Sequence, residues 1–230
     1  GIDGEKGDTG FTGATGFTGF TGEMGQTGPG GIIGSRIYSG IVLPDGLTGL
    51  NGDYYINTVT KGIYEFMLES GYNLEVLATG IGSGSITMDA AGTLYASDYL
   101  NNRILNVTTQ TNLVSSSSEL SQPNGITCDT SGNLFVCDTG NNVILKVDIA
   151  SGTVTTLAGG AQGFINDTGS SASFFNPCGI VYDGAGNLYI SDTGNNAIRI
   201  LNIADASVTT FSSDIETPVG IVMDQNNVYV

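Results

Sequence analysis

The sequence has no histidine and few basic residues. Lysine and arginine together number 6, against 22 aspartates and glutamates, so the 230-residue chain has a formal net charge of -16. This charge repels a phosphate backbone, which argues against a nucleic-acid partner and against RNA recognition on a basic face. The absence of histidine also removes the most common nitrogen ligand of zinc.

Long apolar runs and a cysteine framework are also missing. No stretch of eighteen apolar residues occurs, so the sequence predicts no membrane span. Three cysteines, Cys128, Cys137 and Cys178, are odd in number and show no CxxC spacing, which favours small apolar core residues over disulfides or a zinc ribbon. A turn at residues 129–132 places Cys128 near Leu134, and so leaves Cys137 too far away for a disulfide.

Proline is scarce, but glycine is strictly periodic at the start of the chain. Residues 1–36 form twelve triplets that each begin with glycine, and Pro29 is the one proline among them. This phase predicts a collagen-like triple helix, because only glycine fits at the axis where three chains meet. The tract therefore predicts a homotrimer and a stalk on the order of 100 Å long, with a stability that the low proline content weakens.

The composition of the triplets resembles the collagen-like repeats of bacterial surface proteins and giant-virus particles. Threonine takes the third place in six triplets, and Lys6 is also third in its triplet. The resemblance implies a location outside the cell or on a virion surface, threonines that carry sugar, and hydroxylation at Lys6.

Residues 37–83 are rich in tyrosine and β-branched residues, with turn formers between the runs. We predict short strands at 53–57, 62–66 and 73–77. The segment resembles a small junction module that follows collagen-like repeats in surface proteins. A second interpretation is a partial first blade of the next region, because NLEVLATG at 73–80 aligns with TVTTLAGG at 153–160.

Residues 84–230 contain one repeated unit. The copies align on Asp89, Asp129, Asp183 and Asp224, with spacings of 40, 54 and 41 residues. Each complete copy has an apolar strand, an Asp-x-x-Gly turn, a second strand ending in Asp, a loop ending in Asn-Asn and a third strand. A period near 40 with several short strands predicts the four-stranded blades of a β-propeller. Residues 134–137 are apolar on both faces, which fits a sheet stacked between two others.

The units resemble NHL repeats. The resemblance rests on Pro-x-Gly-Ile motifs at residues 123–126, 177–180 and 218–221, on the Asp-x-x-Gly turn and on the Asn-Asn corner; the first copy lacks the proline motif. Residues 157–180 resemble the glycine-rich insertion of bacterial and viral members. The family usually closes six blades, whereas this sequence holds three units and the start of a fourth. We therefore expect a mainly β, partial propeller that is a fragment of a longer chain.

The sequence DTGNN recurs at the corners, at residues 138–142 and 192–196, with a variant at 98–102. Calcium needs six to eight oxygens, and one such loop offers too few. We interpret the loop as a structural turn, in which the aspartate accepts hydrogen bonds from the amides of its own loop and glycine or asparagine adopts the left-handed conformation.

The sequence thus favours a non-enzymatic structural or interaction protein whose propeller binds a protein or glycan. It predicts no catalytic, cofactor-binding or metal-binding residues. Two sequons, at Asn106 and Asn166, permit N-glycosylation in a secretory pathway. The alternative is a secreted lyase-like or hydrolase-like propeller enzyme tethered by the stalk. Some NHL relatives are amidating lyases with histidine zinc ligands, so that alternative requires catalytic residues in blades outside this sequence.

Overall fold

The structure is a computed structural model that describes residues 79–82, 84–115, 119–224 and 227–230, together with the backbone of four strands between residues 37 and 78. The predictions for the collagen-like tract at residues 1–36, including Lys6, lie outside the described residues.

Three four-stranded antiparallel sheets follow one another along the chain. The first blade comprises β5 (Ile86–Met88), β6 (Leu94–Asp98), β7 (Arg103–Asn106) and β8 (Thr111–Val114). The second comprises β9 (Pro123–Cys128), β10 (Asn133–Asp138), β11 (Val143–Asp148) and β12 (Val154–Gly159). The third comprises β13 (Pro177–Tyr182), β14 (Asn187–Asp192), β15 (Ala197–Asn202) and β16 (Val208–Ser212), and a pair, β17 (Val222–Asp224) and β18 (Asn227–Tyr229), comes after it. The four-stranded sheets predicted from the repeat are confirmed.

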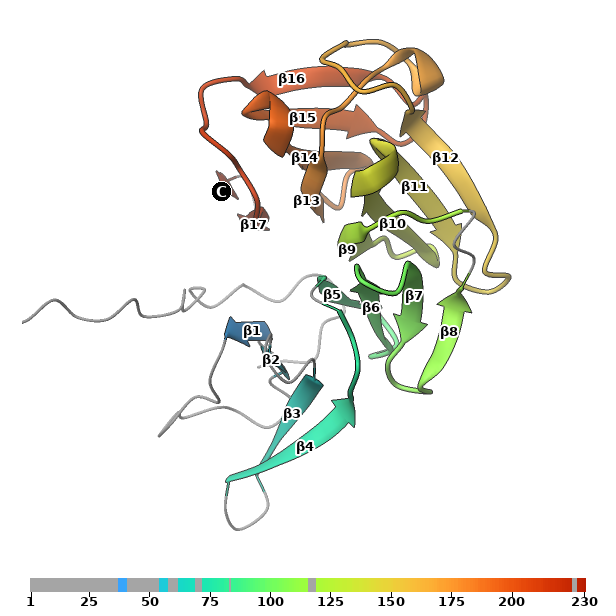
Figure 1. Ribbon diagram of the computed structural model, residues 1–230, viewed down its shortest axis with the longest axis vertical. Coiled ribbons are helices and arrows are strands. Elements are labelled where there is room, and N and C mark those ends of the chain that lie inside the picture. The colour runs from blue at the N-terminus through green and yellow to red at the C-terminus, as the bar shows by residue number, and fades with distance from the viewer. Residues whose placement is uncertain are drawn as a thin grey trace, which may run out of the picture.

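The blades are arranged as a fan around their first strands. β5 contacts β9, β9 contacts β13, and β13 contacts β17, whereas β8, β12 and β16 lie on the outer side (Figure 1). Glycine occupies the point where first strands converge. A β-carbon on Gly125 would meet the carbonyl oxygen of Cys178, and one on Gly179 would meet that of Val219. The glycine of the Pro-x-Gly-Ile motif is therefore required by the close approach of neighbouring blades.

The hydrophobic core lies between the blades. The strand β10 is buried in this core on both faces, which explains why residues 134–137 are continuously apolar. Leu134, Phe135, Val136 and Cys137 have no exposed surface. Phe135 and Cys137 pack with the third blade, and Leu134 and Val136 pack with residues of the first. Both faces of the strand are thus buried, as the sequence predicted, and all three cysteines are free.

A fourth sheet precedes the blades. Its strands are β1 (Ile37–Gly40), β2 (Tyr54–Asn57), β3 (Gly62–Leu68) and β4 (Tyr72–Ala78), in that order. β2, β3 and β4 match the three predicted strands, whereas β1 was not predicted and pairs with β2 in parallel. The register of the β3–β4 pairing shifts after the second residue of β3. The β7–β8 and β11–β12 pairings shift at the same place, after the second residue of β7 and of β11. The junction and partial-blade interpretations of residues 37–83 both remain predictions.

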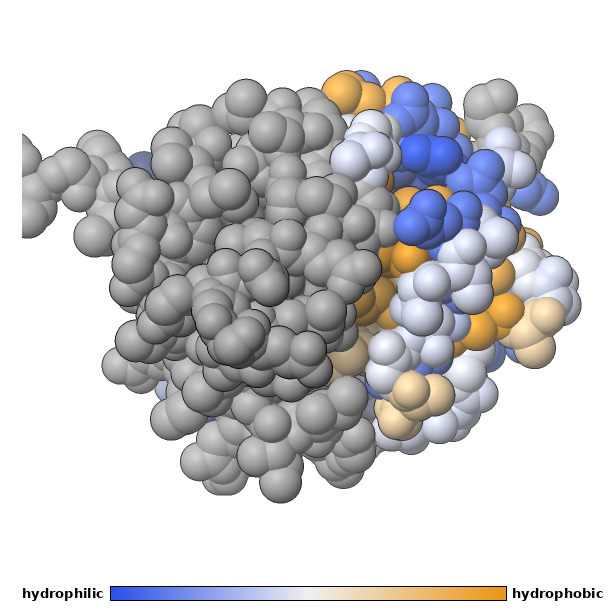
Figure 2. Space-filling view, turned by 90° about the horizontal axis from the view of Figure 1, so that it is seen from below, coloured by the Kyte–Doolittle hydropathy of each residue, from blue (hydrophilic) through white to orange (hydrophobic). Residues whose placement is uncertain are grey.

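On the face seen in Figure 2, the coloured residues mix hydrophilic and hydrophobic groups. No helix among these residues is long and apolar enough to cross a membrane.

Candidate functional site

The repeated polar residues cluster at two kinds of turn. The first is the Asp-x-x-Gly turn between the first and second strands of each blade. In the second blade, Oδ1 of Asp129 accepts hydrogen bonds from the backbone N–H groups of Ser131 (2.8 Å) and Asn133 (2.9 Å), and Oδ2 accepts one from Asn133 Nδ2 (2.7 Å). Asp183 binds the turn of the third blade in the same way. These aspartates close hairpins.

The second kind is the corner after the second strand, where Asp98, Asp138 and Asp192 have no exposed surface. Each accepts a hydrogen bond from the side-chain amide of the first asparagine in its own loop, at 2.6 to 2.9 Å. Each also accepts one from a backbone N–H that lies 16 or 17 residues upstream, from Gly82, Ser121 or Phe175 respectively. The predicted hydrogen bond between the corner aspartate and an amide of its own loop is therefore present. The hydrogen bond from the upstream backbone N–H was not predicted.

The second asparagine of each corner, at 102, 142 or 196, has the predicted left-handed backbone, with φ between 50° and 56°. Its side-chain oxygen accepts a hydrogen bond from the backbone of the next blade: Asn142 from the N–H of Asn176 (2.8 Å) and Asn196 from that of Thr217 (2.9 Å). The hydroxyl of Thr139 donates to the carbonyl oxygen of Pro177 (2.6 Å). The corner loop thus joins each blade to the following one.

The three corners differ in their cations. Arg103 Nε donates to Oδ2 of Asp98 at 2.6 Å, with 26% of the arginine side chain exposed. Arg199 Nη1 donates to Oδ2 of Asp192 at 2.8 Å, with both side chains fully buried. Among the described residues, Asp138 has no cationic partner.

Arg199 is the largest fully buried side chain of the described residues. Besides Asp192, its guanidinium donates to the carbonyl oxygens of Ser173 (3.0 Å) and Ile165 (2.9 Å) and to Oδ1 of Asn166 (2.7 Å). The rings of Phe164 and Phe174 lie 4.7 and 5.2 Å from its central carbon, within cation–π range. The guanidinium therefore fastens the glycine-rich insertion to the third blade.

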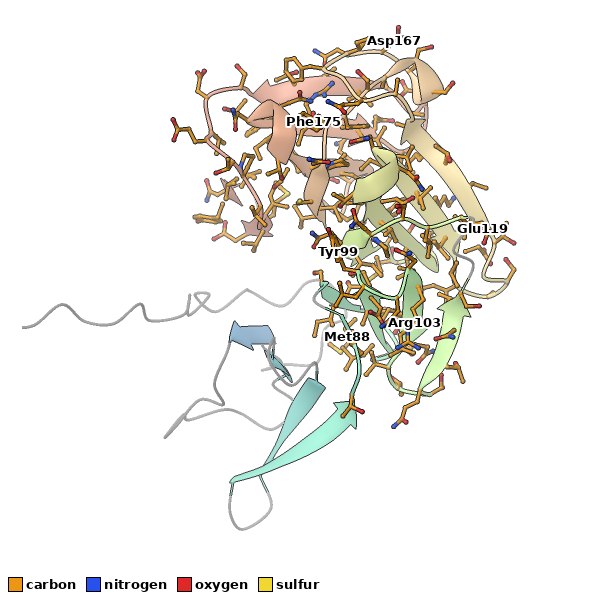
Figure 3. All side chains as sticks on the ribbon, in the orientation of Figure 1. Met88, Tyr99, Arg103, Glu119, Asp167 and Phe175 are labelled. Atoms are coloured by element: carbon orange, nitrogen blue, oxygen red, sulfur yellow. The ribbon has the colours of Figure 1, made fainter. Side chains whose placement is uncertain are left out.

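A surface cavity of about 410 Å³ lies beside Asp138, on the outer half of the second blade. Figure 3 shows Glu119 on the segment that leads into this blade. The polar side chains of the wall are Glu119, Asp138, Asn141 and Thr156, and the apolar ones are Val143, Leu145 and Val154. Two carboxylates and an apolar wall suit a ligand with a cationic head and an apolar stem.

Burial raises the pKa of two of the corner carboxylates, Asp138 and Asp192. It raises the pKa of Asp138, and hydrogen bonds from the backbone N–H of Ser121 and from Asn141 offset the effect only in part. Burial also raises the pKa of Asp192 and is opposed there by Asn195, Phe175 and Arg199. Arg199 thus opposes the effect of burial on the pKa of Asp192, whereas no cation among the described residues does so for Asp138.

The two sequons lie in different surroundings. Asn106 ends β7, and its Oδ1 accepts a hydrogen bond from the backbone N–H of Thr109 (3.0 Å). Asn166 is exposed, and its Oδ1 accepts hydrogen bonds from Arg199 and Thr210. Glycosylation of either residue stays a prediction. The residues that the structure describes contain no group of three or more histidine, cysteine, aspartate or glutamate side chains placed to hold a metal ion.

Comparison with protein-family models gave no match, and neither did comparison with curated protein sequences. Solved structures do match. A catalytically inactive histidine-to-alanine variant of virginiamycin B lyase from Staphylococcus aureus, crystallised with quinupristin, has a TM-score of 0.58 at 18% identity, over 76% of this chain and 57% of that one. An auxiliary nutrient binding protein from Bacteroides ovatus has a TM-score of 0.57 at 19% identity, over 73% of this chain and 49% of that one.

The selenomethionine form of the same lyase aligns with a TM-score of 0.54 at 20% identity, over 73% of this chain and 55% of that one. The blades have a β-propeller fold. At these identities the likeness concerns the fold alone, and the chain spans about half the length of the structures it matches.

Proposed function

We propose that the protein is a non-enzymatic display protein. Three copies of residues 1–36 form a collagen-like stalk, and the stalk presents propeller blades built from NHL-type repeats on a virion or cell surface. The blades bind a protein or glycan ligand. Trimerisation gives the three heads avidity for a ligand that each binds weakly.

The observation that carries this proposal is the unbroken glycine phase of residues 1–36, joined in one chain to repeated blades. The use of the corner residues supports it. In all three blades the corner aspartate binds the segment that leads into its own blade, and the second asparagine binds the backbone that leads into the next blade, so these residues serve structure at every copy. The excess of negative charge also opposes non-specific binding to nucleic acid.

Circular dichroism and sedimentation of the full chain test the stalk. We expect a trimer with a triple-helix signal that melts cooperatively on warming. Gly16→Ala should lower the melting temperature of this signal, because alanine does not fit at the axis of the triple helix. Thr15→Ala is the matched control. Thr15 is the third residue of its triplet and points outward, so this change should alter the melting temperature little. A monomer with no triple-helix signal at low temperature would sink the proposal.

A propeller enzyme is the second candidate function, favoured by the likeness to virginiamycin B lyase. Replacement of one histidine inactivates that lyase, and this chain has no histidine. The alternative therefore predicts histidine or clustered acids in blades outside this sequence. Incubation of quinupristin with a longer chain that includes such blades, followed by mass spectrometry, separates the two candidates, because the display function predicts no conversion.

A further inference from the structure

The second and third blades are equivalent residue by residue, at a constant offset of 54 positions. Leu145 faces Thr156 in the β11–β12 pairing, and Arg199 faces Thr210 in the β15–β16 pairing. Asp138 therefore corresponds to Asp192, and Leu145 corresponds to Arg199. Upstream of the blades, Ser121 and Phe175 donate the same backbone hydrogen bond to these aspartates. The same offset places Glu119 at the position of Ser173.

In the third blade, the space between the corner aspartate and the upstream segment holds the guanidinium of Arg199. Asp192 binds it through a charged oxygen, and the carbonyl oxygen of Ser173 binds it from the upstream segment. Oδ2 of Asp192 accepts from Asn195 and from Arg199 at once, each at 2.8 Å. A guanidinium thus binds the corner carboxylate without displacing the loop asparagine.

The second blade keeps the acceptors and lacks the guanidinium. Asp138 retains its asparagine and its upstream N–H, while Leu145 takes the place of the arginine. The cavity lies at this position. Glu119 adds a second carboxylate where Ser173 offers a neutral carbonyl. Two acids thus line the position that an arginine fills in the neighbouring blade.

We infer that this cavity binds a guanidinium group that belongs to a ligand. Asp138 and Glu119 accept its N–H groups in charge-assisted hydrogen bonds, and Val143, Leu145 and Val154 pack against its apolar stem. Asp138 lines the cavity without exposed surface, so the guanidinium meets the exposed Glu119 first. The inference rests on the proposed ligand-binding function of the blades and names the chemistry of the ligand.

The surroundings favour a cationic ligand. Residues 84–230 contain thirteen carboxylates and three basic side chains, and two of those three are already paired with Asp98 and Asp192. A calcium ion fits less well, because it requires six to eight oxygen ligands. The guanidinium has two sources, a free small molecule such as agmatine or an arginine side chain of a polypeptide.

Isothermal titration of the full chain tests the inference with three probes. Agmatine represents the free small molecule, the tripeptide Gly-Arg-Gly represents the polypeptide, and the same peptide with citrulline in place of arginine is the neutral control. We expect one site per chain for agmatine or the arginine peptide, weaker affinity at higher salt, and no saturable binding of the citrulline peptide. The tighter of the two cationic probes identifies the source.

Variants locate the site. Asp138→Asn should weaken binding about tenfold, and Glu119→Gln about threefold because Glu119 is exposed. Leu145→Arg should abolish binding, since its own guanidinium fills the cavity as Arg199 does in the third blade. Glu216→Gln removes an exposed carboxylate elsewhere and should leave the affinity unchanged.

Absence of saturable binding of either cationic probe overturns the inference, as does equal binding of the citrulline peptide. Full affinity in Glu119→Gln, an exposed change that the fold tolerates, overturns the location even if Leu145→Arg does not fold. Sedimentation of the same samples reports on the stalk separately, so failure of the cavity and failure of the display function are distinguishable.

Discussion

Replacing Arg199 by leucine, the residue at the equivalent position of the second blade, tests the buried ion pair of the third blade. Arg199 and Asp192 are both fully buried, and the guanidinium also satisfies the carbonyl oxygens of Ser173 and Ile165. Leucine offers none of these hydrogen bonds. The substitution leaves a buried carboxylate without its cation and detaches the glycine-rich insertion from the blade.

The expected cost follows from those contacts. Breaking a buried ion pair by removal of one partner costs about 3 to 5 kcal/mol, and leucine recovers part of this through its own apolar burial. We therefore expect the free energy of unfolding to fall by about 3 kcal/mol. For a chain of this size, such a loss lowers the melting temperature by roughly 6 to 12 °C.

Equilibrium denaturation in urea measures this loss, and Arg103→Leu is the matched control. Arg103 pairs with Asp98 in the first blade, but its side chain is 26% exposed, so we expect a loss of about 1 kcal/mol. Limited proteolysis gives a second readout, because Arg199→Leu should speed cleavage within residues 161–176. A loss below about 1 kcal/mol for Arg199→Leu, or an equal loss for both variants, would refute the reasoning.

Three further predictions concern the contact between blades, the corner carboxylate of Asp138 and the hairpin carboxylate of Asp183. Gly125→Ala should destabilise the protein by about 2 kcal/mol, because its β-carbon meets the backbone of the next blade, whereas Gly220→Ala enters open space and should cost less than about 1 kcal/mol in the same urea assay. Burial raises the pKa of Asp138, so the stability of the native protein relative to Asp138→Asn should be greatest below about pH 4 and should decline as pH rises through the raised pKa. Burial also acts on Asp183, but hydrogen bonds from Asn187 lower its pKa overall, so the stabilisation relative to Asp183→Asn should be present above about pH 4 and lost as pH falls through the lowered pKa. Denaturation at several pH values measures both, and parallel slopes would contradict the assignment.

Much of the fold was predictable because the same pattern of strands and turns recurs in each unit of the sequence. The Asp-x-x-Gly turn forms a hairpin through hydrogen bonds within five residues. The turns at Asp129 and Asp183 therefore predict a strand before and after each of them. The continuous apolar run at 134–137 predicted burial on both faces, and both faces are buried. The strand β1 was missed because it pairs with β2 in parallel, and a parallel pair leaves no hairpin pattern in the sequence.

The candidate site could not be predicted in the same way. The corner aspartates have partners 16 or 17 residues upstream, and the second asparagines bind backbone of the next blade, up to 34 residues downstream. A signal did exist in the sequence. Aligned on the corner aspartate, the first unit has an arginine at 103, the third has one two positions further along at 199, and the second has none. That difference has no meaning until the register shows that Leu145 and Arg199 occupy the same place.

The sequence by itself determined the glycine phase of the first 36 residues, the number of repeats, the order of strands and turns within each unit and the excess of negative charge, because each depends on local spacing or on composition. The tertiary structure decided which corner carboxylates receive a guanidinium and which one borders a cavity. That outcome depends on side chains from separate strands and from a remote loop meeting at one point, which only the packing of blade against loop brings about.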